Sequence, residues 1–320
     1  MTRDVLGAKD LNVVFRALQG RGEVRAVDGV TFGLQEREIL ALVGASGSGK
    51  TTLSRTLLGL EQPTSGSATA FGSALPRSGR PLRDFRRRTQ LVMQDPSAAL
   101  NPQHSVYESV AEGIRLHDLV RRATMRGEDV TEIELVSRAL SHAGVRPPER
   151  FFLSYPHELS GGQRQRVLIA GALAVEPEII IADEPVASLD ASIRGEILAL
   201  FLKLRDELGL SLLVVTHDLG LAWNIADRVA VMQEGRIVEI GPTEQVLLEP
   251  QHEYTRELFA ALPSPQQRGA LSDREQIDIP ARDGAEGASL SGKSTSRAEE
   301  LDDPTRRSGP ESAGLDDTPL

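Results

Sequence analysis

A run of glycine, serine, lysine and threonine near position 50 has the residue types and spacing that bind a triphosphate. It has the pattern G-x-x-x-x-G-K-[ST]. The glycines let backbone amides approach phosphate oxygens closely. The lysine then neutralises β- and γ-phosphate oxygens, and the threonine hydroxyl binds Mg²⁺. The expected cofactor-binding residues are Gly44, Ala45, Ser46, Gly47, Ser48, Gly49, Lys50, Thr51 and the next residue, Thr52.

The segments on both sides of this loop support the nucleotide interpretation. The apolar run of residues 39–43 is typical of a buried parallel strand, and residues 51–58 are typical of a helix. The alternative is a Gly/Ser-rich loop without function, and the strand-loop-helix context disfavours it.

A second motif of the phosphate-binding type is formed by Leu159, Ser160, Gly161, Gly162 and Gln163. A serine hydroxyl and unobstructed glycine amides at the start of a helix form an anion site that the helix dipole strengthens. The motif taken alone is also consistent with a turn that caps a helix over residues 163–174.

Two adjacent carboxylates, Asp183 and Glu184, end the apolar run of residues 179–182. Successive residues of an extended chain point in opposite directions, so the two acids should have different tasks. We expect Asp183 to hold Mg²⁺ and Glu184 to orient or deprotonate the attacking water. The alternative is a solvated turn after a strand.

The rest of the chain predicts an α/β fold. Residues 9–43 alternate polar and apolar positions around turn signals, which indicates antiparallel strands. Further strands and a basic helix around residues 82–89 follow. Helical periodicity from about residue 95 to 158 indicates a helical subdomain, placed at about 95–165, inserted into the sheet domain. After Ser160 helices and strands alternate, which predicts a parallel sheet flanked by helices over residues 163–174, 179–182, 192–208, 211–216 and 219–226.

Composition limits the folded part of the 320 residues. Residues 264–320 contain no aromatic residue and carry 12 acidic and 7 basic side chains, so their charge is −5 of the −10 total. We expect a disordered acidic tail there and a folded domain over residues 1–263. There is no cysteine, which excludes disulfides and cysteine-ligated metals, and the acidic balance argues against nucleic acid as a partner.

No apolar run approaches the ~20 residues that span a bilayer, and the N-terminus lacks the apolar segment of a secretory signal. Any work at a membrane is therefore expected to need a partner subunit.

The motifs together, with His217 in the segment 214–219, resemble the ATP-binding subunit of an ABC transporter over about residues 9–262. The resemblance implies a P-loop NTPase cassette with an antiparallel β subdomain, a RecA-like parallel-sheet core and an inserted helical subdomain. In this family two cassettes pair head to tail. Each ATP, with Mg²⁺, lies between the phosphate loop of one subunit and the Ser160-type segment of the other.

The resemblance assigns three further residues. Gln94 matches the glutamine that senses Mg²⁺ and the γ-phosphate, His217 matches the switch histidine, and Asp190 matches an aspartate that reaches across the dimer. The segment of Asp190 reads Ala-Ser-Leu-Asp where Ser-Ala-Leu-Asp is usual. Phe15 is the candidate for stacking on adenine, and a buried strand residue is the equal alternative.

The segments 94–102, 155–158 and 250–255 resemble the dipeptide, oligopeptide and nickel import group. Glu253 replaces the usual proline, and the usual cysteine-containing C-terminal segment is absent. The resemblance implies an ATPase at the cytoplasmic face of the membrane that works with transmembrane permease subunits and, indirectly, with an extracellular solute-binding protein. A heterodimer with a second ABC ATPase is expected, and a homodimer stays open.

Three other functions are less consistent with the sequence. A soluble cassette ATPase that acts on nucleic acid or ribosomes usually has tandem cassettes or a long coiled-coil insertion, and neither is seen. A regulatory subunit without catalysis would have lost Glu184, His217 or Ser160, which are all present. A P-loop kinase is disfavoured, because the motif at residues 159–163 has no function in that class of enzyme.

Overall fold

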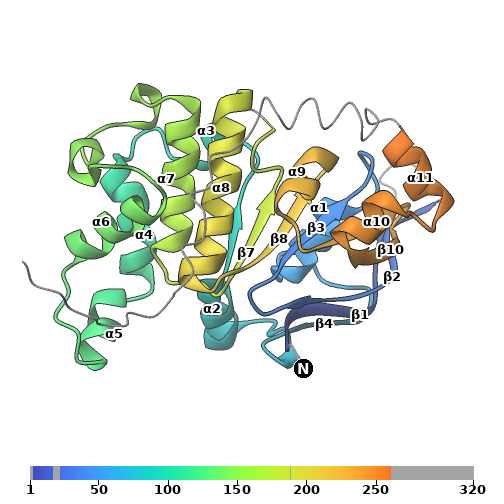
Figure 1. Cartoon of the computed structure of the whole chain (residues 1–320). Coiled ribbons are helices and arrows are strands. Elements are labelled where there is room, and N and C mark those ends of the chain that lie inside the picture. Colours follow the sequence, from blue (N-terminus) through green and yellow to red (C-terminus); the bar gives the residue numbers. More distant parts are fainter. Residues whose placement is uncertain (1–2, 17–21, 188, 261–320) are drawn as a thin grey trace, which may run out of the picture. The chain divides into compact units, whose positions relative to one another are not determined.

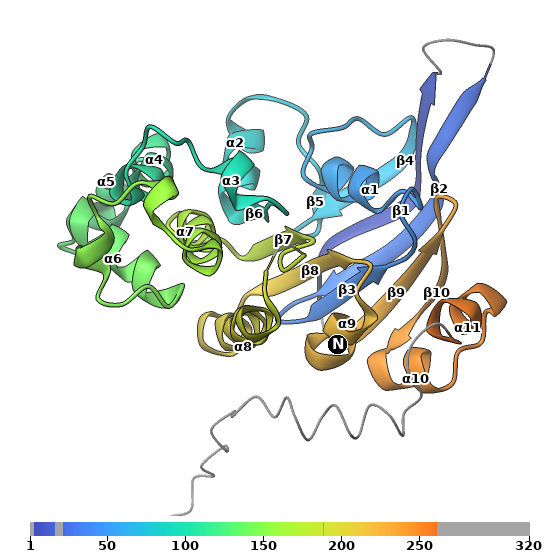
Figure 2. The same cartoon turned by 90° about the horizontal axis from the view of Figure 1, so that it is seen from above.

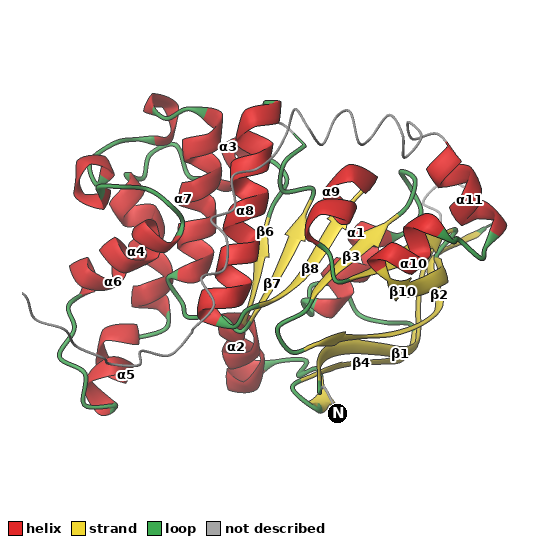
Figure 3. Ribbon diagram, viewed as in Figure 1, coloured by secondary structure: helices red, strands yellow, loops and turns green. Residues whose placement is uncertain are grey.

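The computed structural model describes residues 3–16, 22–187 and 189–260. The predicted acidic tail of residues 264–320 and the predicted boundary at residue 263 lie outside these ranges. Within them the strands form two sheets, one antiparallel and one largely parallel (Figures 1 and 3). This arrangement confirms the predicted α/β fold class.

The antiparallel sheet has the strand order β2-β1-β4-β5. Its long strands pair from Asp4 opposite Gln35 to Arg16 opposite Glu23, so the first strand starts earlier than predicted. The strands are β1 (Asp4–Arg16), β2 (Glu23–Gln35), β4 (Ser65–Ala70) and β5 (Ser73–Ala74).

The larger sheet has the strand order β10-β9-β3-β8-β7-β6, and every pairing except β10 with β9 is parallel. Its central strands consist of apolar residues that are almost all buried, as expected for strands covered on both faces. The strands are β3 (Ile39–Val43), β6 (Thr89–Val92), β7 (Ile179–Asp183), β8 (Ser211–Thr216), β9 (Arg228–Gln233) and β10 (Arg236–Pro242).

The predicted helices are present with small shifts of their ends. Serine or threonine caps hold the starts of α4, α6 and α7, each through a capping box with the residue three positions on. The α-helices are α1 (Lys50–Leu57), α2 (Gly79–Arg88), α3 (Pro96–Ala99), α4 (Val106–Leu116), α5 (Leu119–Met125), α6 (Glu132–His142), α7 (Gly161–Leu173), α8 (Ala191–Leu208), α9 (Leu219–Ile225), α10 (Thr243–Leu248) and α11 (Glu253–Ala260).

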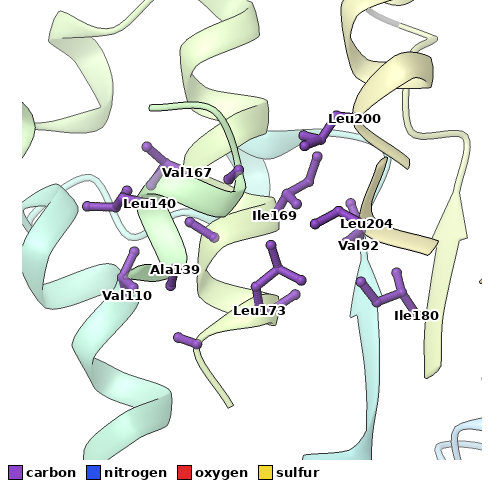
Figure 4. Close-up of a cluster of buried hydrophobic side chains, with 14 of the residues drawn as sticks. Val92, Val110, Ala139, Leu140, Val167, Ile169, Leu173, Ile180, Leu200 and Leu204 are labelled. Atoms are coloured by element: carbon purple, nitrogen blue, oxygen red, sulfur yellow. The ribbon is translucent and has the colours of Figure 1, made fainter. Parts of the chain in front are cut away.

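Helix α7 connects the helical region to the parallel sheet. Helices α4 to α7 gather beside the β6 and β7 edge (Figure 2). One apolar cluster runs through α7, from Val110 of α4 and Leu140 of α6 to Val92 of β6 and Leu204 of α8 (Figure 4). Because α7 is apolar on both of these sides, it is buried between them. No helix among the described residues is both long enough and apolar enough to cross a bilayer.

Candidate active site

The predicted site residues that follow parallel strands lie at one edge of the sheet. Val43 is paired with Thr216, Asp183 with Val215, and Val92 with Ala182. These strands therefore end at nearly the same level, and the residues just beyond them meet. In open α/β sheets this carboxyl edge is where ligands bind.

Close packing explains two glycines of the phosphate loop. A Cβ atom on Gly44 would lie 2.2 Å from the carbonyl oxygen of Met232. On Gly49, whose φ is +105°, it would lie 2.1 Å from the carbonyl oxygen of Ala26. The loop is thus enclosed by strands of both sheets, and it leads directly into α1, which starts at Lys50.

Lys50 folds back over the loop that precedes it. Its Nζ donates to the carbonyl oxygens of Gly44 at 2.8 Å and Ala45 at 2.9 Å, and to Ser48 Oγ at 3.4 Å. Burial lowers the pKa of Lys50, and the charges of Glu184 and then Asp183 oppose this shift. The ammonium group is therefore placed between the loop and the two carboxylates.

Asp183 lies beside the first turn of α1, close enough to Thr51 for that side chain to influence its pKa. Burial raises the pKa of Asp183, the charge of Glu184 raises it further, and Thr51 and Lys50 act against the shift. A half-buried carboxylate crowded by a second one is a favourable place for a divalent cation.

These residues fit Mg²⁺, which prefers oxygen ligands and commonly binds through one or two carboxylates plus substrate phosphates. Asp183 and Thr51 supply such oxygens. Among the described residues no group of three His, Cys, Asp or Glu side chains forms a complete protein metal site. The fit is thus to a cation that arrives with a phosphate ligand.

Glu184 turns the other way, toward the end of β8. Its Oε1 lies 2.6 Å from His217 Nδ1 and accepts from the His217 amide at 3.0 Å, while its Oε2 accepts from Thr216 Oγ1 at 3.2 Å. Asp183 and Glu184 thus face different neighbours, and their different tasks stay a prediction; strand alternation is not the cause of this arrangement. Glu184 lies beyond the strand with a left-handed φ of +48°, so strand alternation does not direct it.

His217 presents its ring to solvent, with 62% of the side chain exposed. The Nδ1 atom faces Glu184, and Nε2 makes no hydrogen bond within the described ranges. The next residue, Asp218, caps α9 by accepting from the amides of Gly220 and Leu221. The Nδ1 side of the His217 ring is therefore held by Glu184, and the Nε2 side is exposed to solvent.

Gln94 and Asp190 lie at the expected edge but make no side-chain hydrogen bond in the part of the chain that the structure describes. Gln94 is exposed and follows β6, just before Asp95 caps α3. Asp190 is exposed at the N-cap position of α8. Ser188, the altered position of the Asp190 segment, lies outside the described residues.

Phe15 lies on β1 opposite Val24, and 40% of it is exposed. The alternative of a buried strand residue is therefore wrong. The adjoining strand continues to Ala26, whose carbonyl group touches Gly49. Stacking of Phe15 on adenine stays a prediction.

The Ser160 motif is not part of this cluster. Ser160 Oγ accepts from the Gln163 amide at 3.2 Å, and Gln163 Oε1 accepts from the Ser160 amide at 2.9 Å. In both views β7 lies between α7 and α1 (Figures 1 and 2). Among the described residues no hydrogen bond or ion pair joins residues 159–163 to residues 44–51.

The glycines of this motif have different surroundings. A Cβ atom on Gly162 would lie 2.7 Å from Ile193 Cγ2 of α8, whereas on Gly161 the nearest contact would be Leu189 at 3.7 Å. Gly162 is thus required by helix packing, and Gly161 leaves its backbone accessible.

Two contacts of the site were not predicted. Thr216 binds Glu184, and the Tyr254 hydroxyl accepts from the Ala45 amide at 3.1 Å. Thr216 precedes His217 in the quoted segment, and Tyr254 belongs to the quoted segment 250–255. Both residues lie in recognisable segments, but their contacts depend on the fold.

Comparison with known proteins gives consistent results. Residues 27–187 match the family model described as ABC transporter. The chain is 42% identical over 245 residues to the "Oligopeptide transport ATP-binding protein OppF" of Streptococcus mutans, covering 76% of this chain and 77% of that protein. It is 44% identical over 242 residues to the "Glutathione import ATP-binding protein GsiA" of Salmonella choleraesuis, covering 75% of this chain and 37% of that protein.

Solved structures agree with the fold. The cbiO1 protein of Clostridium perfringens, described as part of the ABC transporter complex cbiONQ, has a TM-score of 0.66 and 29% identity, covering 84% of this chain and 99% of its own. A dimeric ATP-binding cassette, MJ0796, bound to ADP and Pi has a TM-score of 0.62 and 26% identity, covering 74% of this chain and 98% of its own.

Proposed function

Because the chain belongs to the ABC transporter family as an ATP-binding subunit, we propose that it powers the import of peptides or of nickel-like solutes. The chain binds ATP and is an ATPase peripheral to the membrane. The peptide assignment is supported by the relatives named for oligopeptide and glutathione transport, and by the segments quoted from this sequence. A soluble cassette ATPase without a permease is not favoured, since these relatives are transport proteins.

The observation that carries the catalytic proposal is the placement of Glu184. Its carboxylate is held by Thr216 and His217 at the sheet edge, beside the half-buried Asp183 and Lys50. A fixed carboxylate at this place can accept a proton from a water molecule that attacks the γ-phosphate. His217, with its exposed ring, would contact the γ-phosphate, and Gln94 would respond to its presence.

The phosphate loop would bind the β- and γ-phosphates through its amides and Lys50. Thr51 and Asp183, with Gln94, would hold Mg²⁺, which when bound neutralises phosphate charge. Phe15 would stack on the adenine ring. The remaining oxygen ligands of the cation would come from the nucleotide.

We expect the ATP site to be completed by a second cassette. The Ser160 motif is separated from the loop of its own chain, although its hydroxyl and the Gly161 amide suit a phosphate. Ser160, Gly161, Gly162, Gln163 and Asp190 would then serve the nucleotide of the partner. The partner is a related ATPase or a second copy of this chain.

The other partners follow from the importer proposal. Transmembrane permease subunits would contact the cassettes at the cytoplasmic face and change conformation with them. An extracellular solute-binding protein would deliver the solute. ATP binding would close the pair of cassettes, and hydrolysis would release it.

The substitution Glu184→Gln tests the catalytic proposal. We expect ATP turnover to fall about 100-fold or more, while ATP binding persists. Glu178→Gln is a matched control, because Glu178 precedes the other end of β7 and pairs there with Arg88. Undiminished turnover in Glu184→Gln, or an equal loss in the control, would remove Glu184 from its assigned role.

A further inference from the structure

Residues 251–255, which lead into and begin α11, have no role in the function proposed so far, yet hydrogen bonds and burial hold them in place. Glu239 of β10 accepts hydrogen bonds from the amides of Gln251 at 2.9 Å and His252 at 3.0 Å. Thr255, just after Tyr254, is fully buried. The segment is therefore bound to the sheet just before Tyr254 and buried just after it.

Tyr254 extends from this anchored segment to the phosphate loop. Its hydroxyl oxygen lies 3.1 Å from the amide nitrogen of Ala45 and accepts its hydrogen bond. The ring packs beside an apolar cluster that includes Val43, Val246 and Phe259. The hydroxyl contact joins residues that are 209 positions apart in the sequence.

The other end of the same peptide group is held by Lys50. The carbonyl group of Gly44 and the amide of Ala45 belong to one planar peptide, in which C=O and N–H point in opposite directions. The carbonyl oxygen accepts from Lys50 Nζ at 2.8 Å, while the amide donates to Tyr254. The peptide plane is thus fixed between the ammonium group and the tyrosine.

We propose that Tyr254 is a positioning residue for ATP binding, which sets the Gly44–Ala45 peptide and through it the place of Lys50. A peptide that follows glycine rotates easily because no side chain restricts it. A residue with a side chain at position 44 would limit this rotation, but the carbonyl group of Met232 leaves no room for a Cβ atom there. Tyr254 limits the rotation of the Gly44–Ala45 peptide from outside the loop, through its hydrogen bond with the Ala45 amide.

This inference rests on the proposed binding of ATP by Lys50, and it assigns a task to the hydroxyl group rather than to the ring. A structural role of Tyr254 in docking α11 would depend on the ring, which Tyr254→Phe retains. The same substitution removes the acceptor of the Ala45 amide. The two roles are therefore separable by this variant.

The test uses the full-length chain and two measurements. Amide hydrogen exchange at Ala45 reports the hydrogen bond, and the Kd of Mg·AMP-PNP reports nucleotide affinity. In Tyr254→Phe we expect Ala45 exchange to rise and the Kd to rise, each about three- to tenfold, the typical worth of one hydrogen bond.

Tyr107→Phe is the matched control. Tyr107 also loses a hydroxyl hydrogen bond, 2.8 Å long to Glu132, but it lies in α4 away from the loop. We expect this variant to match wild type in both measurements. Unchanged Ala45 exchange, unchanged affinity, or an equal loss of affinity in Tyr107→Phe overturns the proposal.

Lys50→Ala separates failure of this inference from failure of the proposed function. If wild type and Lys50→Ala bind the nucleotide equally, the proposed role of Lys50 is wrong. If Lys50→Ala weakens binding and Tyr254→Phe does not, only the inference about Tyr254 is wrong.

Discussion

Thr216 links two parts of the site through a single hydroxyl group. Its Oγ1 donates to Glu184 Oε2 at 3.2 Å and accepts from the Asp218 amide at 2.9 Å. The residue is 1% exposed, so water does not readily replace either bond. Thr216 therefore helps to set the direction of the carboxylate and the start of α9.

The substitution Thr216→Val tests this positioning role. It keeps a similar volume and removes the hydroxyl, so we expect kcat for ATP to fall about tenfold and KM to change less than about twofold. Thr216→Ser keeps the hydroxyl and should retain most of kcat. Steady-state kinetics distinguish the outcomes, and full kcat in Thr216→Val would contradict the role.

At the residue scale the sequence predicted those site residues that belong to a motif with fixed spacing. Lys50, Asp183 and His217 lie at one sheet edge because each belongs to a segment next to a parallel strand. Thr216 and Tyr254 were missed, because their contacts depend on strand register and on the docking of a distant helix. Strand alternation, on which the expectation for Glu184 was based, does not apply to its left-handed backbone.

Helix α7 meets α8 where Gly162 faces Ile193, and this contact predicts the effect of an added methyl group. In Gly162→Ala the new Cβ atom would lie 2.7 Å from Ile193 Cγ2, so the Ile193 side chain or one of the helices must shift. We expect a loss of stability of about 1–3 kcal/mol, as is usual for overpacking.

The double variant Gly162→Ala with Ile193→Ala is the control for this packing. Removal of the Ile193 side chain gives the new methyl group space, so the two losses should sum to more than the loss in the double variant. Thermal unfolding of the four proteins measures this coupling. Strict additivity would show that the contact does not limit position 162.

The docking of the segment before α11 should depend on pH through Glu239. Burial alone would raise the pKa of Glu239, but hydrogen bonds from the amides of Gln251 and His252 help to hold it below its usual value. A carboxyl group with a lowered pKa stabilises the folded chain above its unfolded pKa. That stabilisation is lost as the pH falls through the folded pKa.

We therefore expect Glu239→Gln to increase hydrogen exchange over residues 251–256 at neutral pH. The difference from wild type should shrink at acid pH, once Glu239 is protonated in both the folded and the unfolded chain. Exchange rates corrected for intrinsic pH dependence provide the measurement. A difference that persists unchanged below the folded pKa would contradict the assigned charge effect.

At the element scale, uniform apolar runs and capping residues were reliable signals. They predicted β3, β7 and β8, a helical region that contains α4 to α6, and the helices α7, α8 and α9 with ends shifted by one or two residues in most cases. The prediction for α7 started at Gln163 because the capping role of Ser160 places the first turn earlier than apolar periodicity does. The hairpin of β9 and β10 was not predicted, since its turn at Glu234 and Gly235 was overlooked.

The whole molecule carries two segments with phosphate-binding sequence patterns, and no hydrogen bond or ion pair joins them among the described residues. The helices that follow them, α1 and α7, have β7 between them in both views. The proposal that a nucleotide is enclosed by both segments therefore needs two cassettes in head-to-tail contact. The fold alone does not reveal this pairing; the separation of the motifs and the dimeric structural relative support it.

Sedimentation of the Glu184→Gln variant, alone and mixed with a sister cassette, tests the central claim most directly. We expect Mg·ATP to convert single cassettes into pairs, and Ser160→Arg in both subunits to prevent this. Thr131→Arg, which alters an equivalent helix cap on α6, should pair normally. If Mg·ATP never strengthens association, or if the Ser160→Arg and Thr131→Arg variants behave alike, ATP is not held between the two segments.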